Sequence, residues 1–432
     1  MSFSSIFARL VAMVGGTMIL LRRQNGDKLT PAMGGHPDIP KAVPQNIPTL
    51  KMPTARGWQG DEKPVAAPGL KVNAFARDLK HPRQIYVLPN GDVLTAEALP
   101  APGGTISPFE YAITSTMRRA GALGESANRI TLLRDKDGDG TAEERHTFLS
   151  GENMPFGMAL IGDTFYVGNT DAVKAFSYAQ DANSLSGDGK VLMTMKPDGH
   201  WTRNLQVAPD GKTLFVSVGS LTNIADEGFE AEKGRACIYE LDPETGNHRI
   251  FAGGLRNPVG MALEPASGTL FTVVNERDGL GDETPPDYLT SVVDGGFYGW
   301  PYCYWGQIVD GRVRQDPEMV KTARQPDYAL GGHTASLGLC WLPEGVLPGM
   351  GNGMVIGQHG SWNRSTLSGY RVIFVPFENG KPSGPSRDIL TGFLSDDEKF
   401  SYGRPVGVAI GPGPCLLMAD DVGNVIWRIT GA

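Results

Sequence analysis

The sequence is poor in cysteine and in positive charge, and each shortage excludes a class of protein. Its 432 residues include 4 cysteines, spaced far apart with no CxxC pair and no Cys/His cluster: Cys237, Cys303, Cys340 and Cys415. Neither a zinc site nor a disulfide framework is therefore expected. The 39 basic and 47 acidic residues give a formal net charge of −8. That balance argues against a nucleic-acid-binding protein, because such proteins present a basic surface.

Long helical patterns are also missing. Glycine (57) and proline (32) together make up about a fifth of the chain and are spread throughout it. This content predicts many turns and few long helices. It excludes a helical bundle and disfavours a doubly wound α/β fold. The hydrophobic content of 40% is nevertheless enough for a substantial core.

The most apolar run lies at the N-terminus. It spans residues 6–21, is followed by two arginines, and is short for a membrane span but typical of a signal sequence or signal anchor. A buried N-terminal helix is the alternative. Residues 24–69 are rich in proline and glycine and lack periodicity, which predicts an extended tether. We therefore expect residues 1–23 to send the protein to the periplasm or anchor it in the membrane facing the periplasm; a cytoplasmic location is the alternative.

Beyond residue 70 the chain repeats one pattern six times. A polar or proline-containing lead-in precedes a short apolar strand, a turn, a second apolar strand and a polar exit cluster. The copies begin at His81, Met154, Thr202, Asn257, Ser336 and Arg404. Turns such as Pro89-Asn90-Gly91 and Pro209-Asp210-Gly211 are strong hairpin signals between β-rich runs.

Six hairpins at these intervals predict an all-β fold, a six-bladed β-propeller over residues 70–432. We expect the last strand, 424–430, to share its blade with 70–75 and so close the ring. A two-sheet sandwich is the alternative, but a sixfold repeat with this much loop fits it poorly.

The hairpin geometry predicts where function lies. In an antiparallel hairpin the residues before the first strand and after the second lie at the same end, so lead-ins and exits should surround one mouth of the channel. The lead-ins carry His81, Arg83, Asn153, His200, Arg203, Asn204, Arg256, Asn257, His333 and Arg404. The exits carry Glu97, Asn169, Asp171, Asn223, Glu276, Arg277, Asp278, His359, Arg364, Asp420 and Asp421. We expect a ligand pocket there, with ordinary solvated loop ends as the alternative.

Three segments of this mouth point to particular chemistry. The Arg256-Asn257 pair offers a cationic fork and an amide, which suit a ligand with carboxylates or several carbonyls; an arginine that ties blades together is the alternative. His200 is a candidate general base with a pKa near the working pH, or simply a hydrogen-bonded histidine. The stretch 275–287 is rich in oxygen donors and bends, as a site for a hard cation requires.

A second cation site is suggested by the sequence DKDGDG. Asp135, Asp137 and Asp139 occupy positions 1, 3 and 5 of a calcium loop, and a glycine follows at position 6. Position 12 is His146 rather than glutamate, although Glu143 falls at position 9, so the full EF-hand pattern is broken. The stretch is either a structural calcium loop or an Asp/Gly-rich hairpin turn.

Several segments resemble a known family. LRNPVGMAL at 255–263, GGFYGWPYCYWG at 295–306, GSWNRS at 360–365 and YGRPVG at 402–407 resemble the soluble quinoprotein glucose dehydrogenases, in particular their L-sorbosone dehydrogenase branch. That resemblance covers most of the chain beyond residue 70 and implies a six-bladed propeller that binds pyrroloquinoline quinone (PQQ) and Ca²⁺. It further implies oxidation of a sugar aldehyde by hydride transfer to the quinone, with calcium polarising the accepting carbonyl.

The resemblance also implies catalytic roles. His200 matches the position of the family's base, which takes the substrate proton as hydride leaves. Arg256 and Asn257 match the pair beside the quinone, with Arg256 as the electrophilic partner of the reduced cofactor.

Metal and cofactor ligands follow from the same resemblance. Arg277 and Asp278 lie where the family holds calcium through main-chain carbonyls. Arg404 matches an arginine that binds a cofactor carboxylate, and the basic group before it in the ring is His359 or Arg364.

The chain departs from the family pattern beside the base. The glucose enzymes place an acid immediately before the base, where this sequence has Gly199, and their later acid that orients the base corresponds to Ser220. Either another carboxylate, such as Glu276, orients His200, or this base is weaker.

Two other classes of function stay open. Six-bladed calcium propellers include lactonase-type hydrolases, which need no quinone, and non-catalytic sugar-binding propellers form a further class. Arg256, Arg364 and Arg404 favour the quinone, because a lactonase has no use for such a set. As partners we expect a small sugar substrate and a quinone or cytochrome electron acceptor, no nucleic acid, and membrane association through the N-terminus.

Overall fold

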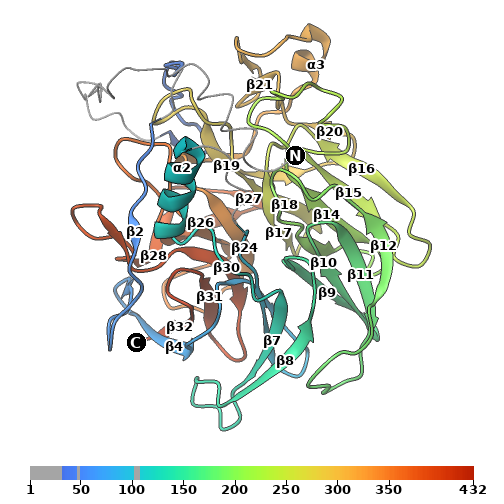
Figure 1. Ribbon diagram of the computed structural model, residues 1–432, viewed down its shortest axis with the longest axis vertical. Helices are drawn as coiled ribbons and strands as arrows, with labels where there is room; N and C mark the ends of the chain where they lie inside the picture. Colours follow the sequence, from blue (N-terminus) through green and yellow to red (C-terminus); the bar gives the residue numbers. More distant parts are fainter. Residues whose placement is uncertain (1–31, 46–48, 102–107) are drawn as a thin grey trace.

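Most of the strands form six sheets, each with four antiparallel strands, arranged as the blades of a β-propeller (Figure 1). The computed structural model describes residues 32–45, 49–101 and 108–432. Within these ranges the helices are α2 (Pro108–Arg119) and α3 (Pro317–Thr322). The all-β, six-bladed fold predicted from the hairpin repeats is confirmed.

The first three blades follow one another along the chain. Blade 1 consists of β5 (Pro82–Val87), β6 (Val93–Glu97), β7 (Arg129–Arg134) and β8 (Glu144–Ser150). Blade 2 consists of β9 (Gly157–Ile161), β10 (Thr164–Gly168), β11 (Ala172–Ser177) and β12 (Lys190–Thr194). Blade 3 consists of β13 (Leu205–Val207), β14 (Leu214–Val218), β15 (Cys237–Leu241) and β16 (His248–Gly253), with β20 (Gly296–Phe297) parallel to β16.

Blades 4 and 5 continue this order. Blade 4 consists of β17 (Pro258–Glu264), β18 (Thr269–Val274), β19 (Pro286–Val292) and β23 (Tyr328–Gly332). Blade 5 consists of β24 (Ser336–Leu342), β25 (Gly353–Gln358), β26 (Arg371–Glu378) and β28 (Arg387–Thr391), with β27 (Lys381–Pro382) beside β26. A small separate hairpin consists of β21 (Cys303–Tyr304) and β22 (Ile308–Val309).

Blade 6 joins the two ends of the propeller. Its strands β30 (Pro405–Ile410), β31 (Leu416–Asp420) and β32 (Val425–Gly431) come from the C-terminal end, and its fourth strand is β4 (Leu70–Ala76). β4 pairs antiparallel with β32 from Ala76 opposite Ile426 to Leu70 opposite Gly431. The predicted ring closure is therefore confirmed.

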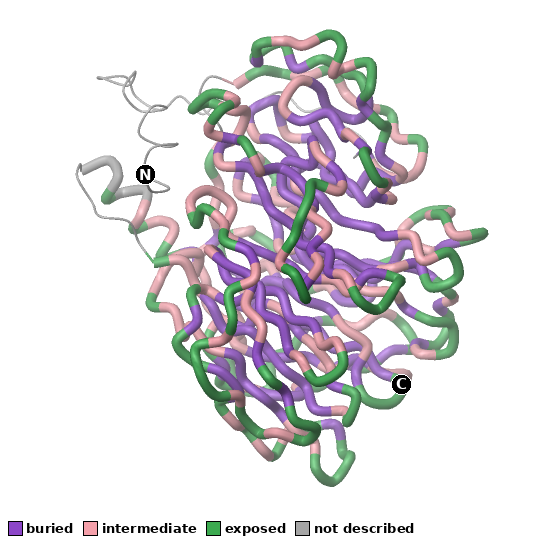
Figure 2. The backbone as a smooth tube through the Cα atoms, turned by 90° about the vertical axis from the view of Figure 1, so that its right-hand side faces the viewer, coloured by how far each residue is buried: buried purple, intermediate pink, exposed green. Residues whose placement is uncertain are grey.

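The core lies between the blades. Strands β6, β14 and β31, with the sequences VLTAE, LFVSV and LLMAD, are buried along their whole length. They lack the polar alternation of a half-exposed strand because a neighbouring blade covers each face. Figure 2 shows the resulting arrangement, with buried strands inside and exposed loops at the rim.

The innermost strands approach one another closely at the channel axis. Four repeats place a bulky apolar residue and then glycine there: Phe156-Gly157, Val259-Gly260, Leu337-Gly338 and Val406-Gly407. The four apolar side chains pack together as a hub. Glycine admits the next strand, because a Cβ on Gly157 would lie 2.5 Å from the Arg203 oxygen and 2.5 Å from the Leu205 nitrogen. The other two repeats have Gln84 and Asn204 at the glycine position.

The segment predicted as a tether is extended, but it is not free of the propeller. It contributes β1 (Met33–Gly34) to blade 4, β3 (Val65–Ala66) to blade 5, and β2 (Thr54–Ala55), which pairs with β29 (Phe400–Ser401). Trp58 donates to Asp420 of blade 6 (2.6 Å) and packs against Trp427. The segment docks because blade edges present unpaired backbone N–H and C=O groups that an extended chain satisfies.

The predicted signal or anchor, residues 1–23, lies outside the described residues, and its role stays a prediction. Within residues 32–45, 49–101 and 108–432, no helix is long and apolar enough to cross a membrane.

The close approach of the inner strands can be tested by adding one methyl group. Gly157→Ala should lower the free energy of unfolding by about 1–3 kcal/mol, because the methyl meets backbone that cannot move without displacing blade 3. Gly351→Ala is the matched control, since nothing lies within 4 Å of a Cβ at that position. Denaturant unfolding measures the difference, and equal stability of the two variants would contradict the explanation.

Candidate functional site

One cavity lies where the lead-ins and exits meet at the mouth of the channel. Its volume is about 360 Å³, which is in the range of small-molecule sites. Five of the six repeats supply polar residues to its wall: His81, Arg83, His200, Asn223, Arg256, Asn257, Glu276, Asp278, His333, His359, Arg404 and Asp421. The structure therefore brings together most of the groups that the hairpin geometry placed at this mouth.

Blade 2 does not contribute to the cavity. Its lead-in residue Asn153 donates to Asp171 (2.8 Å), and Asn169 donates to Glu152. These side chains pair with one another, although Oδ1 of Asn169 has no hydrogen-bond partner among the described residues. The polar groups of blade 2 therefore pair within the blade, with Asn169 and Glu152 buried, and do not line the cavity.

His200 lies in the loop before β13 with one ring nitrogen fixed. Its Nδ1 is 2.8 Å from the main-chain oxygen of Ser220, which can only accept, so Nδ1 carries the proton. The Ser220 hydroxyl donates to the Thr222 carbonyl (2.7 Å). Nε2 therefore holds the lone pair, and no described residue donates to it. A main-chain carbonyl, rather than Glu276 or another carboxylate, orients this imidazole.

The surroundings of His200 keep it neutral. Burial lowers the pKa of His200 to about 3, and the Arg256 charge adds to this effect, while the Ser220 carbonyl and Asp278 oppose it. The expectation of a pKa near the working pH is therefore wrong. A neutral imidazole whose Nε2 is open is a proton acceptor at pH 7.

Arg256 serves both as a link between blades and as a wall of the cavity. Its guanidinium donates to the Glu276 carbonyl (2.8 Å) and to Oδ1 of Asn223 (3.0 Å), which joins the exits of blades 3 and 4. The neighbouring Asn257 is buried, and its Oδ1 has no hydrogen-bond partner among the described residues. An unpartnered buried amide oxygen at a cavity wall marks a position for a ligand or a water molecule.

Three basic residues converge on one carboxylate, Asp421. Its Oδ2 lies 2.8 Å from His359 Nε2 and 3.2 Å from His81 Nε2, and it also pairs with the Arg83 guanidinium. Burial alone would raise the pKa of Asp421, but these three groups hold it well below its ordinary value. Burial and the Arg404 charge lower the pKa of His359 to about 3, so His359 is a neutral donor to Asp421.

Arg404 and Arg364 are also predicted to bind the cofactor. Arg404 lines the cavity, and Arg364 does not. Arg404 donates to the main-chain oxygen of His359 (2.9 Å), and no carboxylate of the described residues pairs with it. The Arg364 guanidinium pairs with Glu283, which is buried. A buried carboxylate requires a cation, so Arg364 is held by the 275–287 loop and does not reach the cavity, contrary to the prediction.

The 275–287 loop runs along the cavity wall. The Arg277 side chain turns into the core, where its Nε lies 3.3 Å from Asp310 Oδ2. The Asp278 carboxylate lies 3.2 Å from His333 Nδ1, and although burial opposes the shift, this pairing raises the pKa of His333. The Asp278 main-chain oxygen accepts from the Asn223 amide (3.0 Å), which leaves one lone pair for a cation. Calcium binding by the main-chain oxygens of Arg277 and Asp278 stays a prediction.

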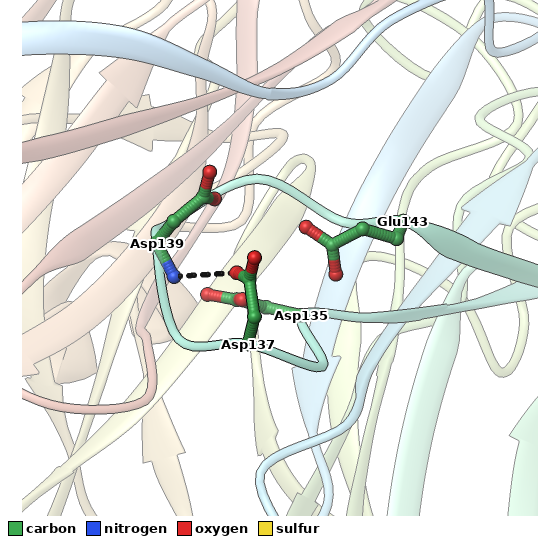
Figure 3. A group of neighbouring side chains, drawn as sticks. All are labelled: Asp135, Asp137, Asp139 and Glu143. Carbon is green, nitrogen blue, oxygen red and sulfur yellow. Dashed lines mark hydrogen bonds between the residues drawn. The ribbon is translucent and has the colours of Figure 1, made fainter.

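The DKDGDG loop gathers its carboxylates at the other end of blade 1 (Figure 3). Asp135, Asp137, Asp139 and Glu143 each place one oxygen within 4.8 Å of the others. The loop joins β7 to β8 on the face opposite the cavity, because the start of β7 pairs with the exit residue Glu97. Calcium binding there also stays a prediction, and such an ion would stabilise the hairpin rather than act in the cavity.

Some residues of the site have roles that sequence reasoning does not supply. Asn223 orients Arg256, and Asp421 collects three basic groups, although the exit clusters indicate only that both lie at the mouth. No sequence signal points to Met52 or Met117, which also line the cavity, because they lie outside the hairpin repeats.

The fold and the cavity define a class: a six-bladed β-propeller with a polar, histidine-bearing cavity at one mouth of its channel. The chain belongs to the TrAA12-like family, whose model matches residues 123–308 and 307–432.

Two relatives and one solved structure extend this comparison. The chain is 31% identical over 234 residues to an uncharacterised protein of Borreliella burgdorferi, covering 53% of this chain and 60% of that protein. It is 26% identical over 328 residues to the pyrroloquinoline quinone-dependent pyranose dehydrogenase of Coprinopsis cinerea, covering 59% of this chain and 43% of that protein. The chain thus spans roughly half the length of these relatives.

The solved structure is the calcium structure of a Trichoderma reesei protein of Carbohydrate-Active Enzymes Family AA12. It matches with a TM-score of 0.70 at 20% identity, over 89% of this chain and 99% of that chain. At this identity the likeness supports the fold.

The proton position on His200 can be measured by NMR of ¹⁵N-labelled histidines, with His200→Gln used to assign the signals. Nδ1 should resonate as a protonated nitrogen and Nε2 as an unprotonated one, without titration between pH 5 and 8. The pKa of His200 is lower in the folded state than in the unfolded chain, so below about pH 6.5 the unfolded chain binds the proton more readily. His200 should therefore lower the free energy of unfolding only as the pH falls below that value. Titration of His200 near pH 6.5 would contradict this assignment.

Proposed function

We propose that this protein is a PQQ- and calcium-dependent sugar dehydrogenase. It would oxidise an aldose or an L-sorbosone-like ketoaldehyde to the lactone or the acid. The observation that carries the proposal is a neutral His200 whose open Nε2 shares one cavity with the Arg256-Asn257 pair. The Coprinopsis relative, a PQQ-dependent pyranose dehydrogenase, supports the cofactor and the substrate class.

The residues of the cavity suit a quinone that carries carboxylates. Arg404 has no carboxylate partner among the described residues, so it offers its charge to an anionic ligand. The unpartnered Oδ1 of Asn257 offers an acceptor to a ligand N–H or hydroxyl. When bound, the quinone with its calcium ion would accept the hydride that leaves the substrate carbon.

The chain itself handles the proton. His200 Nε2 accepts the proton of the substrate hydroxyl as hydride leaves the same carbon, so the new carbonyl forms without a positive charge. The Ser220 carbonyl keeps Nδ1–H in place and stabilises the imidazolium that results. An anionic ligand in the cavity would offset the Arg256 charge and raise the pKa of His200 towards that of an effective base.

The remaining parts of the proposal concern metal and location. Calcium would bind the main-chain oxygens of Arg277 and Asp278, and a second ion would stabilise the DKDGDG loop. Residues 1–23 would place the propeller in the periplasm or at the periplasmic face of the membrane, where a quinone or cytochrome takes the electrons. A calcium-dependent lactonase or a sugar-binding propeller would need neither Arg404 nor Asn257 in the wall.

Reconstitution tests the proposed function. Purified apoprotein supplied with PQQ and Ca²⁺ should reduce a dye with a panel of aldoses and ketoaldehydes, and chelation should abolish this activity reversibly. Arg404→Gln should weaken PQQ binding about tenfold or more. Arg249→Gln, whose guanidinium pairs with exposed Asp294 outside the cavity, is the control and should bind PQQ like the wild type. PQQ binding is read by absorbance and fluorescence titration. Lactone hydrolysis without PQQ, or equal effects of the two substitutions, would count against the proposal.

The role of His200 has its own test. His200→Gln should lower kcat by about 10²–10⁴-fold with PQQ binding almost unchanged, because a positioned base typically contributes that much. Stopped-flow reduction of the bound quinone separates this chemical step from binding. If His200→Gln keeps near-normal turnover with quinone bound, another group is the base, and His359 is the first candidate.

A further inference from the structure

We propose that the N-terminal segment and the chain around α2 form an apolar roof that restricts this site to monosaccharide-sized substrates and excludes disaccharides. The roof consists of Met52, Pro53, Pro100, Met117, Ala120 and Leu123, all of which line the cavity. The inference rests on the proposed sugar dehydrogenase function. It adds the size of the substrate and the residues that select it.

Roof and wall differ in chemistry. The six roof side chains carry no hydrogen-bonding group, whereas His200, Arg256 and Asn257 line the same cavity from the propeller. A second sugar ring pressed against the roof would lose hydrogen bonds to water and gain none in return. A single small sugar can instead direct its hydroxyl groups to the polar wall.

The N-terminal part of the roof is held on both sides. Before Met52, the Lys51 N–H donates to the Trp362 carbonyl (2.9 Å), and the Lys51 ammonium pairs with Glu398. After Pro53, the Thr54 N–H donates to the carbonyl of residue 399 (2.8 Å). The roof therefore belongs to the folded propeller, and a substrate cannot displace it without breaking these bonds.

The chain segments that carry the two parts of the roof lie close together. A Cβ on Gly121, two residues after α2, would lie 3.2 Å from the Ala55 Cβ and 3.1 Å from Val422 Cγ2. Figure 1 shows α2 standing beside β2, in agreement with this close approach. About 360 Å³ of cavity remains below, and the proposed cofactor occupies part of it. The space left for a substrate is correspondingly small.

The experiment compares glucose with maltose in the wild type, in Met52→Ala/Met117→Ala, and in Met319→Ala as the matched control on α3. Trp201 and Trp362 line the cavity, so quenching of tryptophan fluorescence reports sugar binding to the PQQ- and calcium-loaded protein without any need for turnover. Dye reduction gives kcat/KM for the same two sugars.

The roof predicts that the wild type and Met319→Ala prefer glucose by about tenfold or more in Kd and in kcat/KM. The double variant should reduce this preference to about threefold or less, since removing each side chain opens space above the wall. The single variants Met52→Ala and Met117→Ala should give intermediate glucose-to-maltose ratios. They replace the double variant in the comparison if the double variant does not fold.

The outcomes separate this inference from the proposed function. Selective binding of glucose without dye reduction would support the proposed roof and contradict the proposed dehydrogenase function. Equal Kd and kcat/KM values for glucose and maltose in the wild type would overturn the proposed roof. A glucose-to-maltose ratio that is unchanged in all roof variants would also overturn it, while dye reduction would still support the dehydrogenase function. Quenching by neither sugar would overturn the roof as well.

Discussion

Six inner strands must converge on one axis, and the backbone spacing there constrains the rest of the molecule. Gly157 shows the limit, because even a methyl group would meet the backbone of the next inner strand. The apolar residue before each such glycine fills the hub, so the channel is closed by side chains such as Phe156 and Val406. Polar residues just before these strands cannot enter the hub and must lie at the mouth. The same constraint that packs the propeller thus forms the floor of a polar cavity.

The charge that the cavity presents to a ligand depends on which basic side chains already pair with carboxylates, and not simply on how many arginines line the wall. Asp421 pairs with the Arg83 guanidinium and accepts from neutral His359, and Asp278 pairs with His333. Among the described residues no carboxylate pairs with the Arg404 side chain. Arg256 lies 3.7 Å from Asp278, and its charge lowers the pKa of His200 while Asp278 opposes that effect. The result is a neutral imidazole with one open nitrogen, close to positive charge that suits an anionic cofactor.

The N-terminal segment connects structure to the proposed selectivity. β4 closes the ring, β1 and β3 cover the edges of two blades, and the stretch between β1 and β3 passes over the cavity with Met52. Because these contacts are largely backbone hydrogen bonds, docking does not need a repeated sequence signal. Composition alone therefore indicates an extended segment but not that it forms part of the site.

The sequence by itself determined the six hairpins, their turns, the closing strand and the gathering of His200, Arg256, Asn257 and Arg404 at one mouth. Local periodicity and antiparallel geometry suffice for each hairpin and for the end at which its polar residues lie. Repetition of the hairpin six times then predicts that these ends surround one mouth and that the first and last strands close the ring. Only the tertiary structure decided that Glu283 holds Arg364 away, that the Ser220 carbonyl sets the tautomer of His200, and that burial beside Arg256 lowers its pKa. Those outcomes depend on which side chains and carbonyls meet across blades and loops, and on how much water they exclude, which no local pattern encodes.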